Sequence, residues 1–178
     1  MIREKNDFSR PIDREWDVLR VLDADATGSN TTNAQPWFPT NGSVTLDVGL
    51  WQCRGILVMS TGATSHATGL SFGGTATISG MLQAIGQRLA PQGVSAVQNS
   101  TFCITNFSTT RDIGAVGVQG GGWYVYEAMF KVTVAGTLQP RFQFTADPTG
   151  TITIHQGTWF GANRISRDTG FTTRGSWS

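Results

Sequence analysis

The sequence predicts an all-β protein, an antiparallel β-sandwich of jelly-roll type that carries an extended N-terminal arm. Glycine occurs 22 times among the 178 residues, and Thr, Val, Phe and Trp, which favour strands, are frequent. Long runs of the helix formers Ala, Leu, Glu and Lys are missing. This composition indicates strands joined by tight turns, and the length is sufficient for one domain with a buried core.

The clearest predicted strand covers residues 122–135, where two sets of residues alternate. The first set is apolar and consists of Tyr124, Tyr126, Ala128, Phe130, Val132 and Val134; the second is mixed and consists of Trp123, Val125, Glu127, Met129, Lys131 and Thr133. Successive side chains of a strand point to opposite faces, so we expect the first set to be buried and the second to be partly exposed.

A second long strand is predicted from Gly49 to Ser60. One of its sides carries Trp51, Cys53, Leu57 and Met59, and the other carries Ile56 and Val58. Because both sides are apolar, we expect burial on both faces of this strand.

Shorter strands are predicted at 66–72, 75–85, 100–107, 138–145, 151–155 and 157–165. Gly73 and Gly74 separate the first two of these strands. Pro140 lacks a backbone N–H and therefore indicates an edge strand. About eight strands with turn signals between them predict a two-sheet sandwich.

The chain divides into an N-terminal arm (1–40), a β-sandwich domain (41–166) and a polar C-terminal tail (167–178). The arm is too short for its own core and in places too apolar for a linker, so we expect it to dock on a neighbouring subunit; a flexible leader is the alternative. The residues expected to anchor it are Trp16, Val18, Leu19, Val21, Leu22, Trp37 and Phe38.

Charge is distributed unevenly along the chain. Seven of the twelve acidic residues lie within the first 25 positions, whereas between residues 48 and 110 the only charged residues are Arg54 and Arg88. Charged groups are costly to remove from water, and small hydroxyl and amide side chains cost less. A body so poor in charge predicts burial on several faces by self-association, and a neutral monomer covered by hydroxyl groups is the alternative.

Several classes of protein are disfavoured by these features. A net charge of +1 creates no field that attracts nucleic acid. No segment approaches the roughly 20 apolar residues that span a bilayer, and we expect no signal peptide. Cys53 and Cys103 are predicted to be buried thiols rather than a disulfide framework.

Candidate catalytic residues do not form a convincing set, so we predict that the protein is not an enzyme. The segment from Gly69 to Gly73 fits the nucleophile string G-x-S-x-G with Ser71 at its centre, and Asp112 or Asp147 and then His155 follow in hydrolase order. That string requires a following helix, which the sequence after Gly73 does not favour. A glycosidase needs paired carboxylates, but residues 48–111 contain none, and Glu127 is the sole glutamate after Glu15.

No metal or cofactor is expected. Asp23 and Asp25 begin a stretch that resembles a calcium loop, but the twelfth position holds Ala34 instead of a glutamate, so a solvated turn is favoured. His66 and His155 could supply a metal site only on a threefold axis, and ordinary polar roles are favoured. Sugars could stack on aromatic residues that prove to be exposed, and the candidates are Trp51, Trp123, Tyr124, Tyr126, Trp159 and Phe160.

Particular segments resemble a known module. They are NAQPWFP at 33–39, TGATSH at 61–66, GLSFGGTA at 69–76, FKVTVAGTLQPRFQF at 130–144, DPTG at 147–150 and GTWF at 157–160. Together they resemble a module of tailed-bacteriophage virion proteins that occurs in head or tail fibres and in capsid-decorating subunits, and the similarity covers residues 30–164. The resemblance implies a β-sandwich, usually trimeric, without a cofactor.

The sequence therefore predicts a non-enzymatic structural protein of the virion, assembled in the bacterial cytoplasm. It would be a homotrimeric capsid decoration or head-fibre subunit whose N-terminal arm contacts the major capsid protein or another virion component. The alternative is a tail-fibre module that binds host surface glycan.

Overall fold

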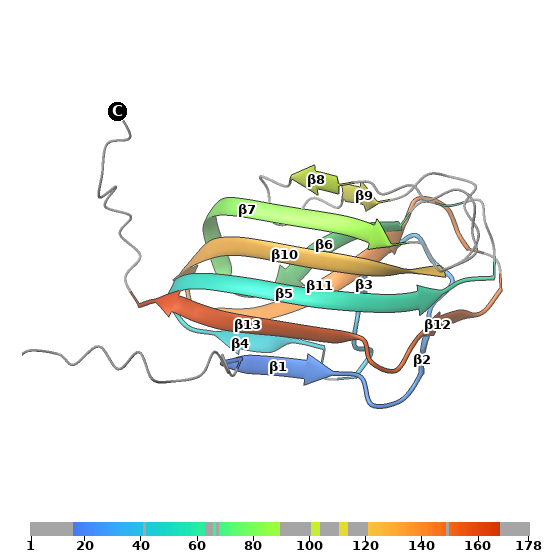
Figure 1. Ribbon diagram of the computed structural model, residues 1–178, viewed down its shortest axis with the longest axis horizontal. Coiled ribbons are helices and arrows are strands. Elements are labelled where there is room, and N and C mark those ends of the chain that lie inside the picture. Colours follow the sequence, from blue (N-terminus) through green and yellow to red (C-terminus); the bar gives the residue numbers. More distant parts are fainter. Residues whose placement is uncertain are drawn as a thin grey trace, which may run out of the picture.

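The computed structural model of the chain consists of two antiparallel β-sheets packed as a sandwich, and its described part contains no helix (Figure 1). The structure describes residues 16–40, 42–62, 66, 68–89, 101–103, 111–113, 121–148 and 150–167, with the backbone alone at 80–89, 101–103, 111–113 and 121. The all-β sandwich predicted from the sequence is therefore confirmed. Residues 1–15 of the predicted arm, residues 114–120 and the tail from 168 lie outside the described residues.

The larger sheet has eight strands. Its main order is β1 (Val18–Val21), β13 (Trp159–Ser166), β5 (Gly49–Ser60), β10 (Gly121–Val134), β7 (Thr77–Leu89) and β8 (Thr101–Cys103). At one end of β5, β12 (Ile152–Ile154) pairs with β5 and with β2 (Ala26–Gly28).

The smaller sheet has five strands. Its order is β3 (Gln35–Pro36), β11 (Gly136–Phe144), β6 (Thr68–Gly74) and β9 (Arg111–Ile113), and β4 (Val44–Leu46) pairs with the beginning of β11.

The two long strands occupy the positions that alternation predicts, but two expectations about burial are wrong for the single chain. β10 buries Tyr124, Tyr126, Ala128, Phe130 and Val132, as predicted, whereas Val134, the last member of the set expected to be buried, is 56% exposed at the end of the strand. β5 alternates strictly between buried and partly or fully exposed residues, so its second face, with Ile56 and Val58, is only partly buried. The reason is that no described element packs on that face, which lies toward the viewer in Figure 1.

Pro140 does not mark an edge strand, because β11 has partners on both sides. On one side β11 pairs with β6. On the other side β4 pairs with β11 as far as Leu138, and β3 pairs with β11 from Arg141 onward. The Pro140 carbonyl accepts the Trp37 N–H at 3.0 Å, so the missing N–H of Pro140 faces the gap between these two short partners. Proline is tolerated there because no ladder hydrogen bond is required at that position.

The break at Gly73-Gly74 falls at the end of β6, where the chain crosses to the larger sheet. Gly74 has φ of +123°, a backbone conformation that favours glycine, and a Cβ at this position would collide with the Thr137 carbonyl. That carbonyl accepts the N–H groups of Thr75 and Ala76, each at 3.0 Å. The turn therefore requires this close approach and this glycine.

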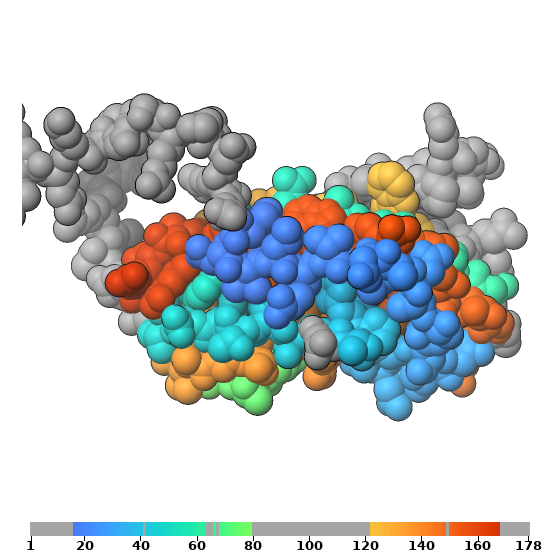
Figure 2. Space-filling model, turned by 90° about the horizontal axis from the view of Figure 1, so that it is seen from below, coloured from blue at the N-terminus to red at the C-terminus, as the bar shows by residue number. Residues whose placement is uncertain are grey.

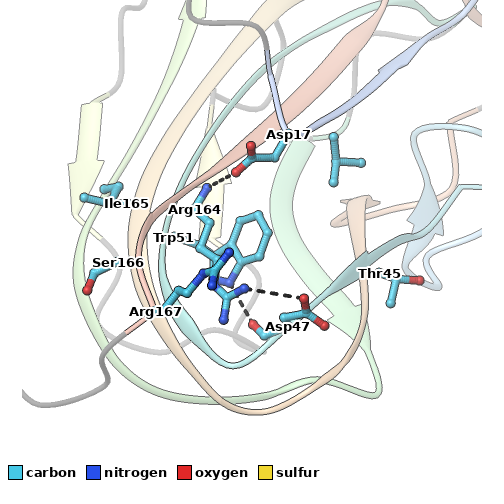
Figure 3. A pocket seen from close by; sticks show the side chains of 9 residues that line it. Asp17, Thr45, Asp47, Trp51, Arg164, Ile165, Ser166 and Arg167 are labelled. Carbon is cyan, nitrogen blue, oxygen red and sulfur yellow. Dashed lines mark hydrogen bonds and ion pairs between the residues drawn. The ribbon is translucent and has the colours of Figure 1, made fainter. Parts of the chain in front are cut away.

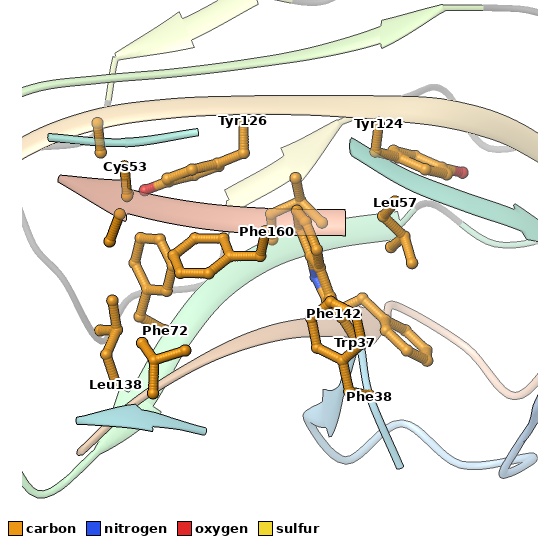
Figure 4. Packing of buried hydrophobic residues seen from close by; sticks show 14 of the residues in the cluster. Trp37, Phe38, Cys53, Leu57, Phe72, Tyr124, Tyr126, Leu138, Phe142 and Phe160 are labelled. Carbon is orange, nitrogen blue, oxygen red and sulfur yellow. The ribbon is translucent and has the colours of Figure 1, made fainter. Parts of the chain in front are cut away.

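Aromatic side chains from both sheets form the core between them (Figure 4). Phe72 of β6 packs edge-on against Tyr126 of β10 at 4.8 Å between ring centroids and against Phe160 of β13 at 5.8 Å. Trp37, 1% exposed, packs edge-on against Phe160 at 6.2 Å. Contacts of this kind across the two layers fix how the sheets face one another.

The described part of the predicted arm, 16–40, is paired with the sandwich. β1 and β2 extend the larger sheet, and β3 extends the smaller one. Viewed from below, these residues form a blue band that crosses the middle of the face and continues to its lower right (Figure 2).

Candidate functional site

The outer face of the larger sheet carries an apolar row that crosses four strands. Val21 of β1 pairs with Trp159 of β13, Trp159 pairs with Ile56 of β5, and Ile56 pairs with Val125 of β10. Paired residues share a face of the sheet, and the chain neighbours Leu57, Tyr124, Tyr126 and Phe160 point into the core. The row therefore lies on the solvent side, and its first member, Val21, is 55% exposed.

Trp123 adds an exposed aromatic surface next to this row. It pairs with Val58, which is two residues from Ile56 on β5, and 53% of Trp123 is exposed. On the side of the row away from Trp123, Arg54 of β5 pairs with Glu127 of β10, so their charges are adjacent. The face is thus apolar in its centre, aromatic at one end and charged at the other.

Trp16 covers the outer face near β1. Its ring lies 5.7 Å from that of Trp159, and a Cβ added to Gly161 would approach the Trp16 ring to 2.5 Å. Glycine at position 161 therefore allows Trp16 to lie flat on β13.

The residues predicted to anchor the arm are not all in one place. Leu19 and Val21 are 46% and 55% exposed on β1, and Val18 and Leu22 are partly buried against the core. Trp37 and Phe38 are buried in the core of the chain itself, at 1% and 4% exposure. The side chains of this set that are most available to a partner are therefore those of Leu19 and Val21.

Among the strands that the structure describes, β1 is terminal in its sheet, and one of its edges carries no partner strand. Leu22 donates its N–H to Thr158 at 2.8 Å and accepts from Gly157 at 2.9 Å, so Leu22 faces β13. Backbone groups alternate along a strand, which directs those of Leu19 and Val21 to the free edge. The Leu19 carbonyl there accepts a hydrogen bond from Arg20 Nη1 at 3.4 Å. A basic side chain on an edge discourages unspecific pairing with other strands.

A cavity of about 660 Å³ lies at the end of β13, beside Trp51 (Figure 3). The Arg164 guanidinium donates to Asp47 Oδ2 at 3.4 Å and to the Val48 carbonyl, and the Arg164 N–H donates to Asp17 Oδ2 at 2.5 Å. These internal pairs engage the carboxylates of Asp17 and Asp47. The arrangement connects the start of β1 to the end of β13 and to the turn before β5.

The residues considered for hydrolysis do not come together. Ser71 is 6% exposed in the middle of β6, and its chain continues along the strand rather than into a helix. His155 follows β12 in the other sheet. Asp147 is exposed after β11, and the side chain of Asp112 lies outside the described residues.

The residues considered for metal binding have other partners. Asp25 accepts the Gln156 N–H at 2.7 Å, and its second oxygen lies 3.3 Å from His155 Nδ1. His66 is 7% exposed and packs edge-on against Phe144 at 4.8 Å, inside the chain. Among the described residues, no group of three or more His, Cys, Asp or Glu side chains could hold a metal ion.

Of the aromatic residues considered for sugar stacking, only two reach the solvent appreciably. Trp123 is exposed and Trp159 is partly buried, both on the outer face of the larger sheet. The remaining four, Trp51, Tyr124, Tyr126 and Phe160, are at most 4% exposed.

Sequence reasoning missed one polar cluster on this face, which consists of Ser60, His155 and Asp25. His155 Nε2 lies 2.9 Å from Ser60 Oγ while Nδ1 faces Asp25. The residues are separated by 95 and 130 positions. No local motif connects them, so only the order of the strands could have revealed the cluster.

Comparison with known proteins adds no assignment: no protein-family model, no curated protein and no solved structure matches this chain. Among the described residues there is no helix long and apolar enough to cross a membrane.

Proposed function

We propose that this protein is a structural subunit of a tailed-bacteriophage particle and that it associates through the outer face of its larger sheet. The observation that carries the proposal is the row Val21, Trp159, Ile56 and Val125 on a face that no described element covers. Contiguous apolar surface of this kind marks sites of association in soluble proteins.

The partner that fits this face best is another copy of the chain. The body is poor in charge, and Arg54 and Glu127 at the border of the face offer one charge of each sign. A second copy would supply complementary charges as well as apolar surface. Following the resemblance to virion modules, the assembly is a homotrimer, and the segment before β1 contacts the major capsid protein or another virion component.

We also propose that the sandwich is of jelly-roll type with an extended N-terminal arm before β1. The first and last strands, β1 and β13, are neighbours, and the chain crosses repeatedly between the sheets from β4 to β7 and again from β9 to β12. Crossings of this kind support two interlocked Greek keys. The pair β7 and β8 then extends the larger sheet beyond β10.

The association surface can be tested with charge substitutions. Val21→Glu and Trp123→Glu would each place a carboxylate in the buried interface, which is costly to desolvate. We expect both variants to sediment more slowly than the wild type at micromolar concentration. Thr45→Glu, at an exposed position on β4 of the smaller sheet, is the matched control and should sediment as the wild type. Identical sedimentation of all four proteins would contradict the proposed surface.

A second candidate function, recognition of host surface glycan, is favoured by the exposure of Trp123 beside the polar cluster. An indole ring stacks on the apolar face of a sugar, and hydroxyl, imidazole and carboxylate groups nearby can bond its hydroxyls. Binding to an array of bacterial surface glycans tests this function. Trp123→Ala should abolish any signal, whereas Val134→Ala, which truncates a 56% exposed residue elsewhere, should not. Absence of binding by the wild type, or equal binding by both variants, would eliminate the glycan function.

A further inference from the structure

Strand register brings Asp25, His155 and Ser60 to one point on the outer face of the larger sheet. Ala26 of β2 pairs with Ile154 of β12, so the next residues on the two antiparallel strands, Asp25 and His155, lie opposite each other. Thr153 of β12 pairs with Ser60 of β5, so Ser60 is a diagonal neighbour of His155. Both Ile154 and its partner Met59 are buried, so the three polar residues next to them face outward.

The distances within the cluster form a continuous chain of hydrogen bonds. Ser60 Oγ lies 2.9 Å from His155 Nε2, and His155 Nδ1 lies 3.3 Å from Asp25 Oδ2. This is the order of contacts in which a hydroxyl meets a base and the base meets an orienting carboxylate. The side chains of His155 and Asp25 are 37% and 57% exposed, so solvent and small molecules reach them.

Backbone hydrogen bonds fix the main chain of His155 and the carboxylate of Asp25. His155 donates its N–H to the Val58 carbonyl at 2.8 Å, and its own carbonyl accepts from Thr158 at 3.2 Å. Asp25 Oδ1 accepts the Gln156 N–H at 2.7 Å, which leaves Oδ2 directed at the imidazole. The imidazole therefore extends from a fixed main chain toward a carboxylate that the backbone holds in place.

The carboxylate also determines which imidazole nitrogen carries the proton. The pKa of Asp25 lies below its ordinary value of 3.8. The hydrogen bond from the Gln156 N–H lowers it most, desolvation opposes this, and the hydrogen bond and charge of His155 lower it further. An ionised carboxylate can only accept, so Nδ1 of a neutral imidazole must carry the hydrogen. Nε2 then presents a lone pair to Ser60, and the Ser60 hydroxyl donates to it.

We propose that Ser60 is a nucleophile activated by His155 and oriented through Asp25, and that it accepts acyl groups from small esters of apolar acids. This activity is separate from the structural role proposed above. The substrate class follows from the surroundings, because the apolar side chain of Val58, which is partly exposed, lies opposite His155 and beside the serine.

The acyl transfer has two balanced steps. The Ser60 oxygen forms a bond to the ester carbonyl carbon while its proton moves to His155 Nε2. The bond from that carbon to the leaving oxygen breaks, and the alcohol departs with the proton from Nε2. Water then attacks the carbonyl carbon of the acyl-serine while His155 Nε2 takes one proton from the water. The bond from that carbon to the Ser60 oxygen breaks, Nε2 returns the proton to this oxygen, and the acid and free Ser60 are released.

The test uses diisopropyl fluorophosphate, which transfers its phosphoryl group to activated serines with loss of fluoride. We expect one adduct by intact-protein mass spectrometry, located at Ser60 by peptide mapping, and none on Ser60→Ala. His155→Gln should slow labelling about a hundredfold or more, the scale of general-base catalysis. Ser79→Ala, which removes an exposed serine on β7, should be labelled like the wild type.

Release of p-nitrophenol from p-nitrophenyl butyrate gives a second readout of the same four proteins and should follow the same order. Melting temperatures establish that each variant is folded, and a variant that is not folded is replaced by His155→Asn or Ser60→Gly. The proposal is overturned if the folded wild type acquires no adduct, or if folded proteins with and without His155 are labelled at equal rates. Either outcome would identify the cluster as a polar contact between β2, β12 and β5, and neither would affect the association surface.

Discussion

Trp123 and Tyr124 are adjacent in the chain, yet the first is 53% exposed and the second 3%. The difference comes from the twofold alternation of a strand, which sends one ring into the core and the other to the outer face. Composition gives the number of aromatic residues but not their location. Only the assignment of each residue to a face of its strand separates the aromatic residues of the core from those that can contact a partner.

At this scale Cys53 gives a direct prediction. It is a fully buried free thiol between the sheets, and burial raises the pKa of Cys53 well above its ordinary value of 9.0. The thiolate is the reactive form, so we expect Cys53 to resist a thiol reagent such as DTNB in the native protein and to react after denaturation in guanidinium chloride. Because the chain has a second cysteine, Cys103, the comparison is made in the Cys103→Ser background. Rapid reaction of native Cys103→Ser would show that Cys53 is accessible.

The cluster of Ser60, His155 and Asp25 shows at the same scale why sequence reasoning considered Ser71 and not Ser60. Ser71 lies in a recognisable nucleophile string, whereas Ser60 lies in no catalytic string. Geometry buries Ser71 and places Ser60 against an imidazole. Candidates of this kind arise from contacts between distant residues, and a local pattern carries no information about them.

Long strands are the elements that the sequence predicts best. β5 and β10 have 12 and 14 residues, enough for the alternation to be read without ambiguity. β2 and β3 have only three and two residues, and the turn-rich stretch that contains β2 gives no periodic signal. Their positions are determined by the strands with which they pair, and those partners lie far away in the sequence.

β1 is an element whose stability rests on a few contacts at its ends. Besides its ladder with β13, it is held by Trp16 on Trp159 and by Asp17, whose N–H donates to Asn163 Oδ1 at 2.8 Å. An aromatic pair contributes about 0.5–1.5 kcal/mol beyond the area it buries. Trp16→Ala should therefore lower the free energy of unfolding by about 1 kcal/mol or more.

Urea denaturation measures this change, and hydrogen exchange should show faster exchange confined to β1 and β13. Val134→Ala is the control, since substitutions of exposed residues usually change stability by less than about 0.5 kcal/mol. Equal stability of Trp16→Ala and the wild type would mean that Trp16 does not hold β1 in place.

At the scale of the whole molecule, the uneven charge and the half-exposed outer face have one explanation. The sequence predicts burial on both faces of β5, and the single chain buries only one. An association through the outer face of the larger sheet would cover the second face of β5. In that assembly Val21, Ile56 and Trp123 would be buried by neighbouring copies, while Cys53 and the aromatic core would be unchanged.

Molar mass measured by light scattering on the full chain, over the micromolar range, tests this claim most directly. The account predicts a mass three times that of the 19.1-kDa chain, constant with dilution until dissociation begins. A constant mass of 19.1 kDa throughout that range would contradict it, because the apolar outer face would then be stable in water without a partner.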